Sequence, residues 1–375
     1  MKFGTIVIHS DDYIESRVVG GSAFTYLASY LNKYMNGDIK TYLELDAKKL
    51  IEAKPDVVGI STVTQNFNKS VEIAKAVREN LGNIPILFGG PHITNLPKDL
   101  PKSMDIGIQS EGEETLLELM QLIKSRDINN KDKLKNVLGI SYHGENNEVI
   151  VNKARPLINN LDSIPIPKFS LLNLDYGFKH AIFTSRGCPY KCSFCSSTKM
   201  WNKARLHSAE RVLTEIEFVM KHYPDQDFIG LGDDLFTMSL PRLRKIVELI
   251  RERKIHKKIK FTASVRTSNF DEETAYLLRK MNVSTLFFGF ESGDERVLTE
   301  LKCETHLKDN ERAIKLSEKY GMRVHGGFIL ASPSETKEEL AKTYWFINSN
   351  IKGMERVIIS NATPFTNTNF WDFAI

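Results

Sequence analysis

The sequence predicts an α/β protein with two domains: a parallel sheet covered by helices, followed by a partial (β/α)6 barrel. Three observations lead to this class. Short apolar runs alternate with helical apolar patterns up to about residue 125, the same alternation restarts at Ala181, and a proline-rich stretch separates the two series. The length of 375 residues is enough for two domains of ordinary size.

In the first half, strands are expected at residues 3–8, 39–43, 57–61 and 84–89. The segments between them carry apolar residues at helical spacing, which indicates βα units around a parallel sheet. Ligands of such sheets bind beyond the carboxyl ends of the strands. The helical residues are Phe24, Leu27, Ala28 and Leu31, then Val71, Ala74, Val77 and Leu81, then Leu116, Leu119, Met120 and Ile123.

Three segments at expected strand ends are rich in small and hydroxyl residues: 59–64, 89–94 and 110–114. Small residues let the backbone approach a ligand, and hydroxyls and amides bind polar groups. The Gly89-Gly90 pair alone is also consistent with a plain turn, and Glu111 and Glu113 with a helix cap. Together the three edges favour a large ligand laid across the sheet.

Residues 137–151 are expected to form a hairpin around Gly144, and residues 155–167 a semi-extended, proline-rich linker. We therefore expect one domain at residues 1–136, a hairpin and linker at 137–180, and a second domain at 181–375.

The second half is expected to contain six βα-type units. Apolar runs predict strands at 181–185, 228–232, 260–266, 286–291, 323–330 and 356–361, with a helical stripe between them at Leu243, Ile246, Val247 and Ile250. Functional groups of barrels lie at the carboxyl ends of the strands. The loop after the first strand should therefore lie at that mouth.

That loop carries three of the four cysteines of the chain, Cys188, Cys192 and Cys195, in a C-x3-C-x2-C spacing. Three thiolates on one loop can hold three irons of a cubane cluster and leave the fourth iron open. A buried helix face, a zinc site and a disulfide are the alternatives. Gly187 and Pro189 argue against a helix, no second cysteine pair supports zinc, and Cys303 is expected to be an ordinary thiol.

Composition excludes several classes of partner. The net charge of +4 is slight for this length, so neither nucleic acid nor an anionic membrane is expected as a main partner. No apolar stretch approaches the roughly 20 residues of a membrane span, and the first residues are too short an apolar run for a signal peptide. Few cysteines and no secretory signal indicate the reducing cytoplasm.

The chain resembles the radical S-adenosylmethionine (SAM) enzymes that carry an N-terminal cobalamin-binding domain. The resemblance covers nearly the whole chain and implies that the first domain is Rossmann-like (flavodoxin-like) and binds cobalamin. The cysteine motif is its most specific part. The other matching segments are Gly89-Gly90-Pro91-His92, residues 110–114, Asp162-Ser163-Ile164-Pro165, residues 232–237, Gly289-Phe290-Glu291-Ser292-Gly293 and Gly327-Phe328-Ile329-Leu330.

The resemblance implies a [4Fe-4S] cluster on Cys188, Cys192 and Cys195, whose open iron chelates SAM and releases a 5'-deoxyadenosyl radical after one-electron reduction. It also implies SAM contacts by position: Phe194 against the adenine, a glycine-rich segment at the amino group, and Arg266 and Glu291 at the carboxylate and ribose. The glycine-rich segment is Gly232, Asp233 and Asp234. A helix cap for the two aspartates and a rim salt bridge for Arg266 are the structural alternatives.

For cobalamin the resemblance implies contacts from the three small-residue edges. These are Ser61, Thr62, Thr64, Gly89, Gly90, His92, Thr94, Glu111, Gly112 and Glu113. No Asp-x-His-x-x-Gly motif occurs, so the lower cobalamin ligand is unassigned. Ala331-Ser332-Pro333-Ser334 stands where relatives carry glycines, which suggests an altered backbone near the adenine. A Thr363–Thr368 segment replaces a more usual Pro-Gly-Thr turn, shortly before the chain ends.

The expected function is hydrogen abstraction from an unactivated carbon, followed by methyl transfer from methylcobalamin. Radical cyclisation, rearrangement or oxidation without methyl transfer is a second hypothesis. In a third hypothesis the first domain has lost cobalamin and serves only as a scaffold. In a fourth, the chain is a zinc-binding interaction module without turnover. Expected partners are a small-molecule or peptide substrate and an external one-electron reductant of the flavodoxin or ferredoxin type.

Overall fold

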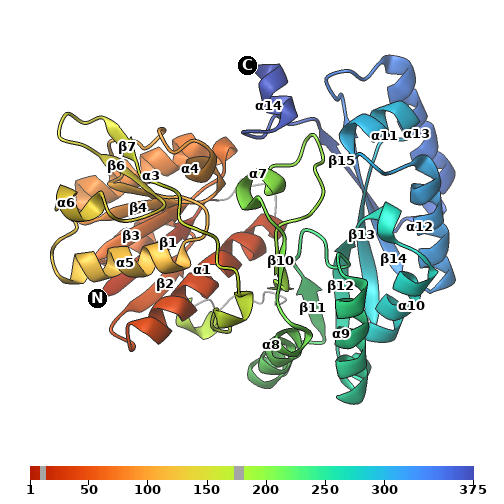
Figure 1. Ribbon diagram of the computed structural model, residues 1–375, viewed down its shortest axis with the longest axis horizontal. Coiled ribbons are helices and arrows are strands. Elements are labelled where there is room, and N and C mark those ends of the chain that lie inside the picture. The colour runs from red at the N-terminus through yellow and green to blue at the C-terminus, as the bar shows by residue number, and fades with distance from the viewer. Residues whose placement is uncertain (9–13, 173–180) are drawn as a thin grey trace. The chain divides into compact units, whose positions relative to one another are not determined.

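The computed structural model describes residues 1–8, 14–172 and 181–375, and the chain forms two compact units, Met1–Phe178 and Lys179–Ile375 (Figure 1). The last eight residues of the expected linker, 173–180, lie outside the described residues. Each unit has its own sheet and its own core, so each is described by itself.

The first unit is built on a sheet in the order β2-β1-β3-β4-β5-β6-β7. The first five strands are parallel, and β6 and β7 continue the sheet as an antiparallel hairpin, as the sequence predicts. The order 2-1-3-4-5 is that of flavodoxin-like folds, whose ligands bind where the strand order reverses, at β1 and β3. The strands are β1 (Lys2–Val7), β2 (Lys40–Glu44), β3 (Val57–Ser61), β4 (Ile86–Gly89), β5 (Ile106–Ile108), β6 (Ile140–His143) and β7 (Val149–Val151).

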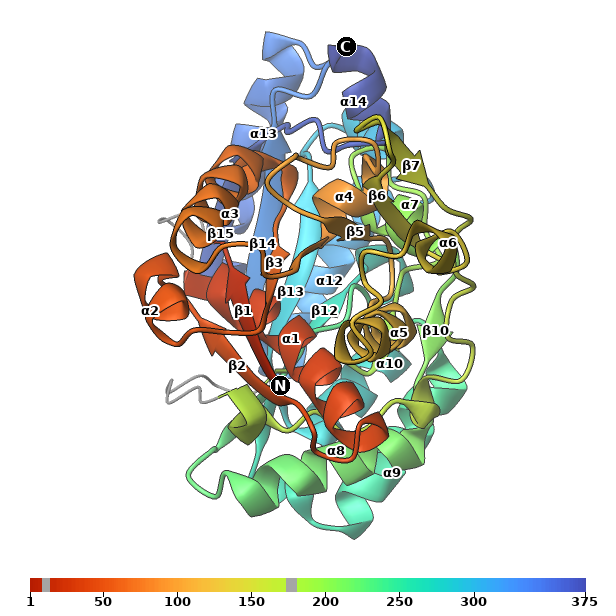
Figure 2. The same cartoon turned by 90° about the vertical axis from the view of Figure 1, so that its left-hand side faces the viewer.

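Helices cover both faces of this sheet (Figure 2). On one face, Leu31 of α1 and Leu116 of α5 pack on the strands, and on the other Leu50 of α2 and Val77 of α3 do so. Successive strand residues such as Val57 and Val58 enter opposite cores, as the two-residue period of a strand requires. The helices are α1 (Ile14–Tyr34), α2 (Ala47–Glu52), α3 (Phe67–Leu81), α4 (Pro91–Asn95), α5 (Glu113–Lys124) and α6 (Lys131–Leu134), with short 3-10 turns at η1 (Thr64–Asn66), η2 (Leu161–Ser163) and η3 (Phe169–Leu172).

The second unit is built on six parallel strands in the order β15-β14-β13-β12-β11-β8, which confirms the expected partial barrel (Figure 1). Its core is rich in phenylalanine, with Phe261, Phe288, Phe290 and Phe328 fully buried. The strands are β8 (Ala181–Ile182), β11 (Phe228–Leu231), β12 (Lys260–Val265), β13 (Val283–Glu291), β14 (Arg323–Leu330) and β15 (Arg356–Asn361).

Helices follow the strands of this sheet in alternation. Four of them, α8, α9, α10 and α12, bury apolar residues at helical spacing, for example Leu243, Ile246, Val247 and Ile250 of α9. The elements are α7 (Ser197–Trp201), α8 (Ala209–His222), α9 (Leu240–Glu252), α10 (Glu272–Met281), α11 (Glu295–Leu301), α12 (Leu307–Lys319), α13 (Lys337–Asn350) and α14 (Asn369–Ala374), with 3-10 turns η4 (Ile255–Lys257), η5 (Thr267–Asn269) and η6 (Ile351–Gly353).

The structure differs from the strand prediction mainly at the start of the barrel and at β5, and β13 begins at Val283 rather than at residue 286. The expected strand 181–185 ends at Ile182, and Ser185–Arg186 forms β9, antiparallel to β10 (Arg205–Leu206). The backbone leaves the sheet because the Thr184 carbonyl accepts hydrogen bonds from Arg242 and from the His207 N–H instead of a strand. The sequence implies a strand end before Ser110 but gives no bounds for the three-residue strand β5, since so short a run has no readable period. In the described part of the chain, no helix combines the length and apolarity needed to cross a bilayer.

Candidate functional site

The cysteine loop follows β9 and is shaped by its glycine. Gly187 has φ +81°, and a Cβ atom there would lie 2.8 Å from Trp201 Cβ, so only glycine fits. The loop is then fixed by two distant segments, because Ser193 N–H donates to the Leu301 carbonyl at 3.0 Å and Asn369 N–H donates to the Ser193 carbonyl at 3.1 Å. The loop is therefore held by α11 and by the start of α14.

The three loop cysteines are half-buried, whereas Cys303 is exposed. Burial raises the pKa of the Cys188 thiol and raises that of Cys195 to about 11. Both thiols are therefore neutral at pH 7 until a metal binds, because a coordinating metal deprotonates its thiol. Across residues 1–8, 14–172 and 181–375, no three His, Cys, Asp or Glu side chains converge on one metal position. A cubane does not require this, since each iron takes one thiolate.

The segment after β11 approaches the loop from one side. Asp234 is exposed and its carboxylate accepts a 2.5 Å hydrogen bond from Ser197, just beyond the last cysteine. Asp233 is buried, and its two oxygens accept from the Thr184 and Ser185 hydroxyls at 2.6 and 2.7 Å. Burial raises the pKa of Asp233. Its carboxylate therefore fixes the bend between β8 and β9, and only its backbone is left for the SAM contact that the sequence predicts.

Gly232 lies beside these aspartates, and a Cβ atom there would lie 2.8 Å from the Phe183 ring. A side chain at this position would displace the ring, so the glycine allows the close packing of β11 on the start of the barrel. Its exposed backbone stays available for the predicted SAM amino contact.

Arg266 lies at the end of β12 and contacts the cysteine loop directly. Its Nη1 donates to Cys192 Sγ at 3.4 Å, and its guanidinium lies 3.9 Å from the centre of the Tyr190 ring. Nε donates to Ser268 at 2.9 Å, and Nη2 donates to the Cys303 carbonyl. The rim salt bridge considered from the sequence is not formed among the described residues.

Glu291 ends β13 in the left-handed region, with φ +59°, which is unusual for a residue with a side chain. Its carboxylate is buried and lies 3.2 Å from Lys302 Nζ, which is buried as well and also donates to the Gly289 carbonyl at 2.6 Å. Sequence reasoning missed Lys302. A lysine one residue from Cys303 carries no recognisable pattern, and only the fold brings it under the strand end.

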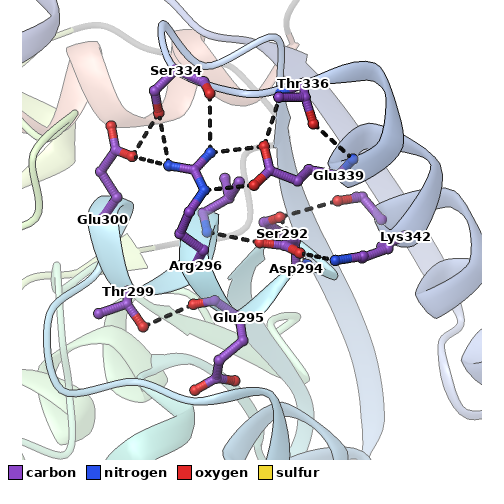
Figure 3. A network of polar contacts seen from close by, with 12 residues as sticks. Ser292, Asp294, Glu295, Arg296, Thr299, Glu300, Ser334, Thr336, Glu339 and Lys342 are labelled. Atoms are coloured by element: carbon purple, nitrogen blue, oxygen red, sulfur yellow. Dashed lines mark hydrogen bonds and ion pairs between the residues drawn. The ribbon is translucent and has the colours of Figure 1, made fainter.

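A polar network ties the segment after β13 to α13 (Figure 3). Arg296 donates to both oxygens of Glu339, at 2.5 and 2.7 Å, and to the Ser334 carbonyl at 3.0 Å. Asp294 accepts from Lys342 at 2.7 Å. The network therefore fixes the loop after β13 and the loop after β14 against the same helix.

The loop after β14 begins at Ala331, where the sequence suggests an altered backbone. Ala331 adopts φ +59°, the left-handed conformation that glycine favours. The alanine therefore keeps a glycine-like backbone at the start of this loop.

Phe194 packs in a small apolar cluster rather than standing alone in the loop. The cluster contains Val297 and Leu301 of α11 and Phe370 of α14, whose ring centre lies 6.5 Å from that of Phe194. Phe194 is only partly buried, so one part of the ring remains available for the predicted adenine contact.

In the first unit, the backbone after β3 and the backbone after β4 approach each other closely, and we call this place the crossing of β3 and β4. Gly90 has φ +97°, and a Cβ atom there would lie 2.7 Å from the Thr62 carbonyl and 2.8 Å from Ser61 Oγ. The neighbouring Gly89 has no heavy atom within 4 Å of its Cβ position, so space is open beside it. Thr94 bridges this crossing to β5, since its hydroxyl donates to the Gly90 carbonyl and accepts from Ser110 N–H.

His92 is an interior residue of this unit. Its ring stacks on Phe67 with centres 4.1 Å apart, and Nδ1 lies 3.2 Å from the Thr64 hydroxyl. Burial lowers the pKa of His92, although the Asp99 carboxylate opposes the shift. His92 and Thr64 therefore shape the start of α3 and α4, and the cobalamin contact expected of each stays a prediction.

The segment after β5 contains two buried glutamates and, next to them, polar atoms that have no hydrogen-bond partner in the described part of the chain. Glu111 and Glu113 are buried, and Glu111 accepts from Ile158 N–H at 2.7 Å, which fastens the linker. Gly112 precedes the first turn of α5. Gln109 Nε2 and Ser110 Oγ are buried without a hydrogen-bond partner within the described ranges. Ser110 begins the 110–114 edge expected from the sequence, whereas Gln109 lies just outside it. Such atoms need a partner that the described residues do not supply, such as a water molecule or a ligand.

Known proteins resemble the chain over both units. Residues 182–347 match the Radical SAM superfamily, and residues 21–120 match the B12 binding domain. An uncharacterized methyltransferase, PH0819, of Pyrococcus horikoshii is 33% identical over 96% of the chain and 80% of that protein. The anaerobic magnesium-protoporphyrin IX monomethyl ester cyclase of Cereibacter sphaeroides is 28% identical over 80% of the chain, which spans 50% of that protein.

A solved structure shows the same fold. The radical SAM methyltransferase TsrM of Kitasatospora setae, with cobalamin and a [4Fe-4S] cluster bound, matches with a TM-score of 0.80 at 17% identity. The match covers 98% of the chain and 73% of TsrM. The chain therefore belongs to the radical SAM superfamily and carries a B12-binding domain. It is a radical SAM enzyme, and the cofactors of its two domains are a [4Fe-4S] cluster with SAM, and cobalamin.

The residues present fit these groups. Three thiols on one glycine-shaped loop match the donor set of a site-open cubane. At the other edge, the open space beside Gly89 and the unpartnered atoms of Gln109 and Ser110 match a large, polar, uncharged surface such as the amide rim of a corrin.

Proposed function

We propose that the chain is a cobalamin-dependent radical SAM methyltransferase that acts on an unactivated carbon. When bound, the cluster and SAM supply a 5'-deoxyadenosyl radical and cobalamin supplies the methyl group. The observation that carries the proposal is the placement of the cysteine loop against the ends of β11 and β12, through Asp234 and Arg266, in a chain that also has a B12-binding domain. The methyltransferase names of PH0819 and TsrM support methyl transfer.

The chain's own residues have distinct tasks in this proposal. Cys188, Cys192 and Cys195 hold the irons, and Asp233 and Gly187 fix the loop that carries them. The backbone after β11, Glu291 and Phe194 are assigned to the amino, ribose and adenine parts of SAM. Arg266 is assigned to the SAM carboxylate by resemblance, although its present hydrogen bond is to Cys192.

In the first unit, we assign cobalamin to the crossing of β3 and β4. Ser61, Thr62 and Thr94 offer hydroxyls there, and Gly89 and Gly90 leave room for a large ligand. Ser110 and Gln109 join them as groups without another partner among the described residues. The assignment of Glu111 and Glu113 rests on their backbone only, because their side chains are buried.

A second candidate function is radical cyclisation without methyl transfer. The similarity to the magnesium-protoporphyrin ester cyclase favours it, since that protein matches 80% of the chain. The substrate class, a small molecule or a peptide, is part of the proposal in either case. The proposal also includes an external one-electron reductant of the flavodoxin or ferredoxin type and a location in the reducing cytoplasm.

The test separates the two functions without a known substrate. The full chain is reconstituted with iron, sulfide and hydroxocobalamin under anaerobic conditions, then reduced with SAM labelled in its methyl group. About four irons per chain, 5'-deoxyadenosine, and labelled methylcobalamin with S-adenosylhomocysteine are expected of a methyltransferase. Deoxyadenosine without any labelled methylcobalamin favours the cyclase. A chain that binds no iron contradicts both.

A further inference from the structure

Arg266 is a buried cation without an anionic partner. Its side chain is 5% exposed, and no Asp, Glu or chain terminus pairs with it in the part of the chain that the structure describes. Buried charges in proteins are as a rule paired or bound to a metal centre, because burial of an isolated charge is costly. The site around Arg266 is therefore electrostatically incomplete until an anion lies beside it.

The guanidinium is held so that one N–H group is aimed at a cluster cysteine. Nε is engaged by Ser268, Nη2 by the Cys303 carbonyl, and one face of the plane by the Tyr190 ring at 3.9 Å. Tyr190 is itself fixed, because its hydroxyl donates to Asn269 at 2.6 Å. With these contacts made, Nη1 lies 3.4 Å from Cys192 Sγ. A planar fork held at three points cannot turn away without losing them.

We propose that Arg266 donates a hydrogen bond to the Cys192 thiolate of the cluster and thereby raises the reduction potential of the cluster. Reduction adds one electron, and so one negative charge, to a cluster already ligated by thiolates. A cation and an N–H donor beside one sulfur stabilise that added charge, and hydrogen bonds to the sulfurs are known to tune such potentials. The inference rests on the proposed function, because it requires the cluster on these cysteines.

This role differs from the SAM-carboxylate contact that the resemblance implies, and the two roles make different predictions. A residue that binds only the carboxylate affects the affinity for SAM, and it acts on the potential of the SAM-free cluster through its charge alone, which Arg266→Lys keeps. A residue that donates to Cys192 affects that potential through the hydrogen bond as well. Measurements on the SAM-free protein therefore isolate the proposed role.

The experiment is a redox titration of the anaerobically reconstituted full chain without SAM, followed by electron paramagnetic resonance. The Arg266→Gln variant is expected to keep about four irons and to shift its midpoint potential negatively by about 59 mV or more, a tenfold change in a one-electron equilibrium. Arg266→Lys, which keeps the charge and loses the fork, is expected to recover part of the shift.

Arg312→Gln is the matched control. Arg312 donates to the carbonyls of Thr267 and Phe270, so it holds the same turn η5, yet it has no cysteine contact among the described residues. Its removal is expected to leave the potential unchanged. Equal potentials for the wild type and Arg266→Gln, each with a full cluster, would overturn the inference and leave the proposed function intact.

A second measurement needs no variant. The wild-type chain is labelled with 15N in the arginine guanidinium, and the reduced, SAM-free cluster is examined for magnetic coupling to 15N. A coupling from one arginine supports the inference, and its absence overturns it even if Arg266→Gln fails to assemble a cluster. A wild type that holds no cluster refutes the proposed function itself.

Discussion

The two edges to which we assign the cofactors differ in charge. At the mouth of the barrel, the strand ends carry buried ionic groups: Asp233, Arg266, and the pair Glu291–Lys302. At the edge of the first sheet, the groups that remain available are neutral, namely hydroxyls and backbone around Gly89 and Gly90. Its two buried acids, Glu111 and Glu113, lie in the segment after β5, where Glu111 holds the linker.

The difference supports this assignment, because the charge of each edge matches that of the cofactor assigned to it. A cluster on thiolates and a zwitterion such as SAM need fixed charges nearby, and these are strongest when desolvated. Cobalamin presents mainly amide groups, which neutral donors and acceptors bind without a desolvation penalty for ions. The following predictions test this contrast, from the largest expected effect to the smallest.

Removal of a cluster ligand is expected to have the largest effect and to be confined to the barrel. Cys192→Ala should lose the cluster, so that iron falls from about four per chain to well below that and no deoxyadenosine forms. Iron analysis and chromatography measure this, and Cys303→Ala is the control. An iron-free Cys303→Ala protein would mean that Cys303 is a ligand. Equal cobalamin uptake by both variants would show that the cobalamin site does not depend on the cluster.

Breaking the buried ion pair is expected to destabilise the barrel strongly. Lys302→Met leaves Glu291 as an uncompensated buried charge, so the free energy of unfolding should fall by about 3–5 kcal/mol. Adding Glu291→Gln should restore part of the loss. Lys342→Met removes an exposed partner of Asp294 and should cost under about 1 kcal/mol. Urea unfolding measures all three, and equal losses for the two lysines would show that burial does not matter here.

Cobalamin binding at the edge of the first sheet is expected to depend on the shape of the site rather than on its charge. Gly90→Ala places a Cβ atom against Thr62 and should weaken cobalamin binding by about tenfold, or 1.4 kcal/mol, with the iron content unchanged. Gly82→Ala is the matched control, because Gly82 also has positive φ, at +70°, but has open space around it. Corrinoid absorbance after gel filtration measures both. Identical cobalamin binding by the two variants would remove Gly90 from the site.

The exposed network behind the barrel mouth is expected to have the smallest effect, and to depend on pH. The hydrogen bond from Arg296 lowers the pKa of Glu339 to about 2, from an ordinary value of 4.5. The stabilisation by Glu339 is therefore fully present above pH 4.5 and is lost as the pH falls toward 2. The melting temperatures of wild type and Glu339→Gln should converge over that window. A constant difference down to pH 3 would contradict the assignment.

The sequence predicted most of the architecture because long apolar periods are local signals. The barrel strands β11 to β15 are such cases, and the β6–β7 hairpin was recognised from the turn residues around Gly144. It gave no bounds for β5, which has only three residues, and it did not predict the break between β8 and β9. That break depends on Asp233 and Arg242, which lie far along the chain from Thr184.

The sequence also placed the candidate site residues at the correct strand ends, but it could not assign their side-chain partners. Asp233 and Asp234 are neighbours in a motif, yet one is buried on two hydroxyls and the other is exposed beside Ser197. Lys302 was missed because its partner Glu291 meets it only in the folded barrel. The roles of these residues toward SAM and cobalamin stay predictions.

The anchors of the cysteine loop have a consequence for biosynthesis. Ser193 is bonded to Leu301, 108 residues later, and to Asn369, which lies still further along the chain. The loop therefore cannot take its anchored conformation until residue 369 has been synthesised. Iron that is held by the loop in this conformation is accordingly bound only after α11 and the start of α14 have been translated.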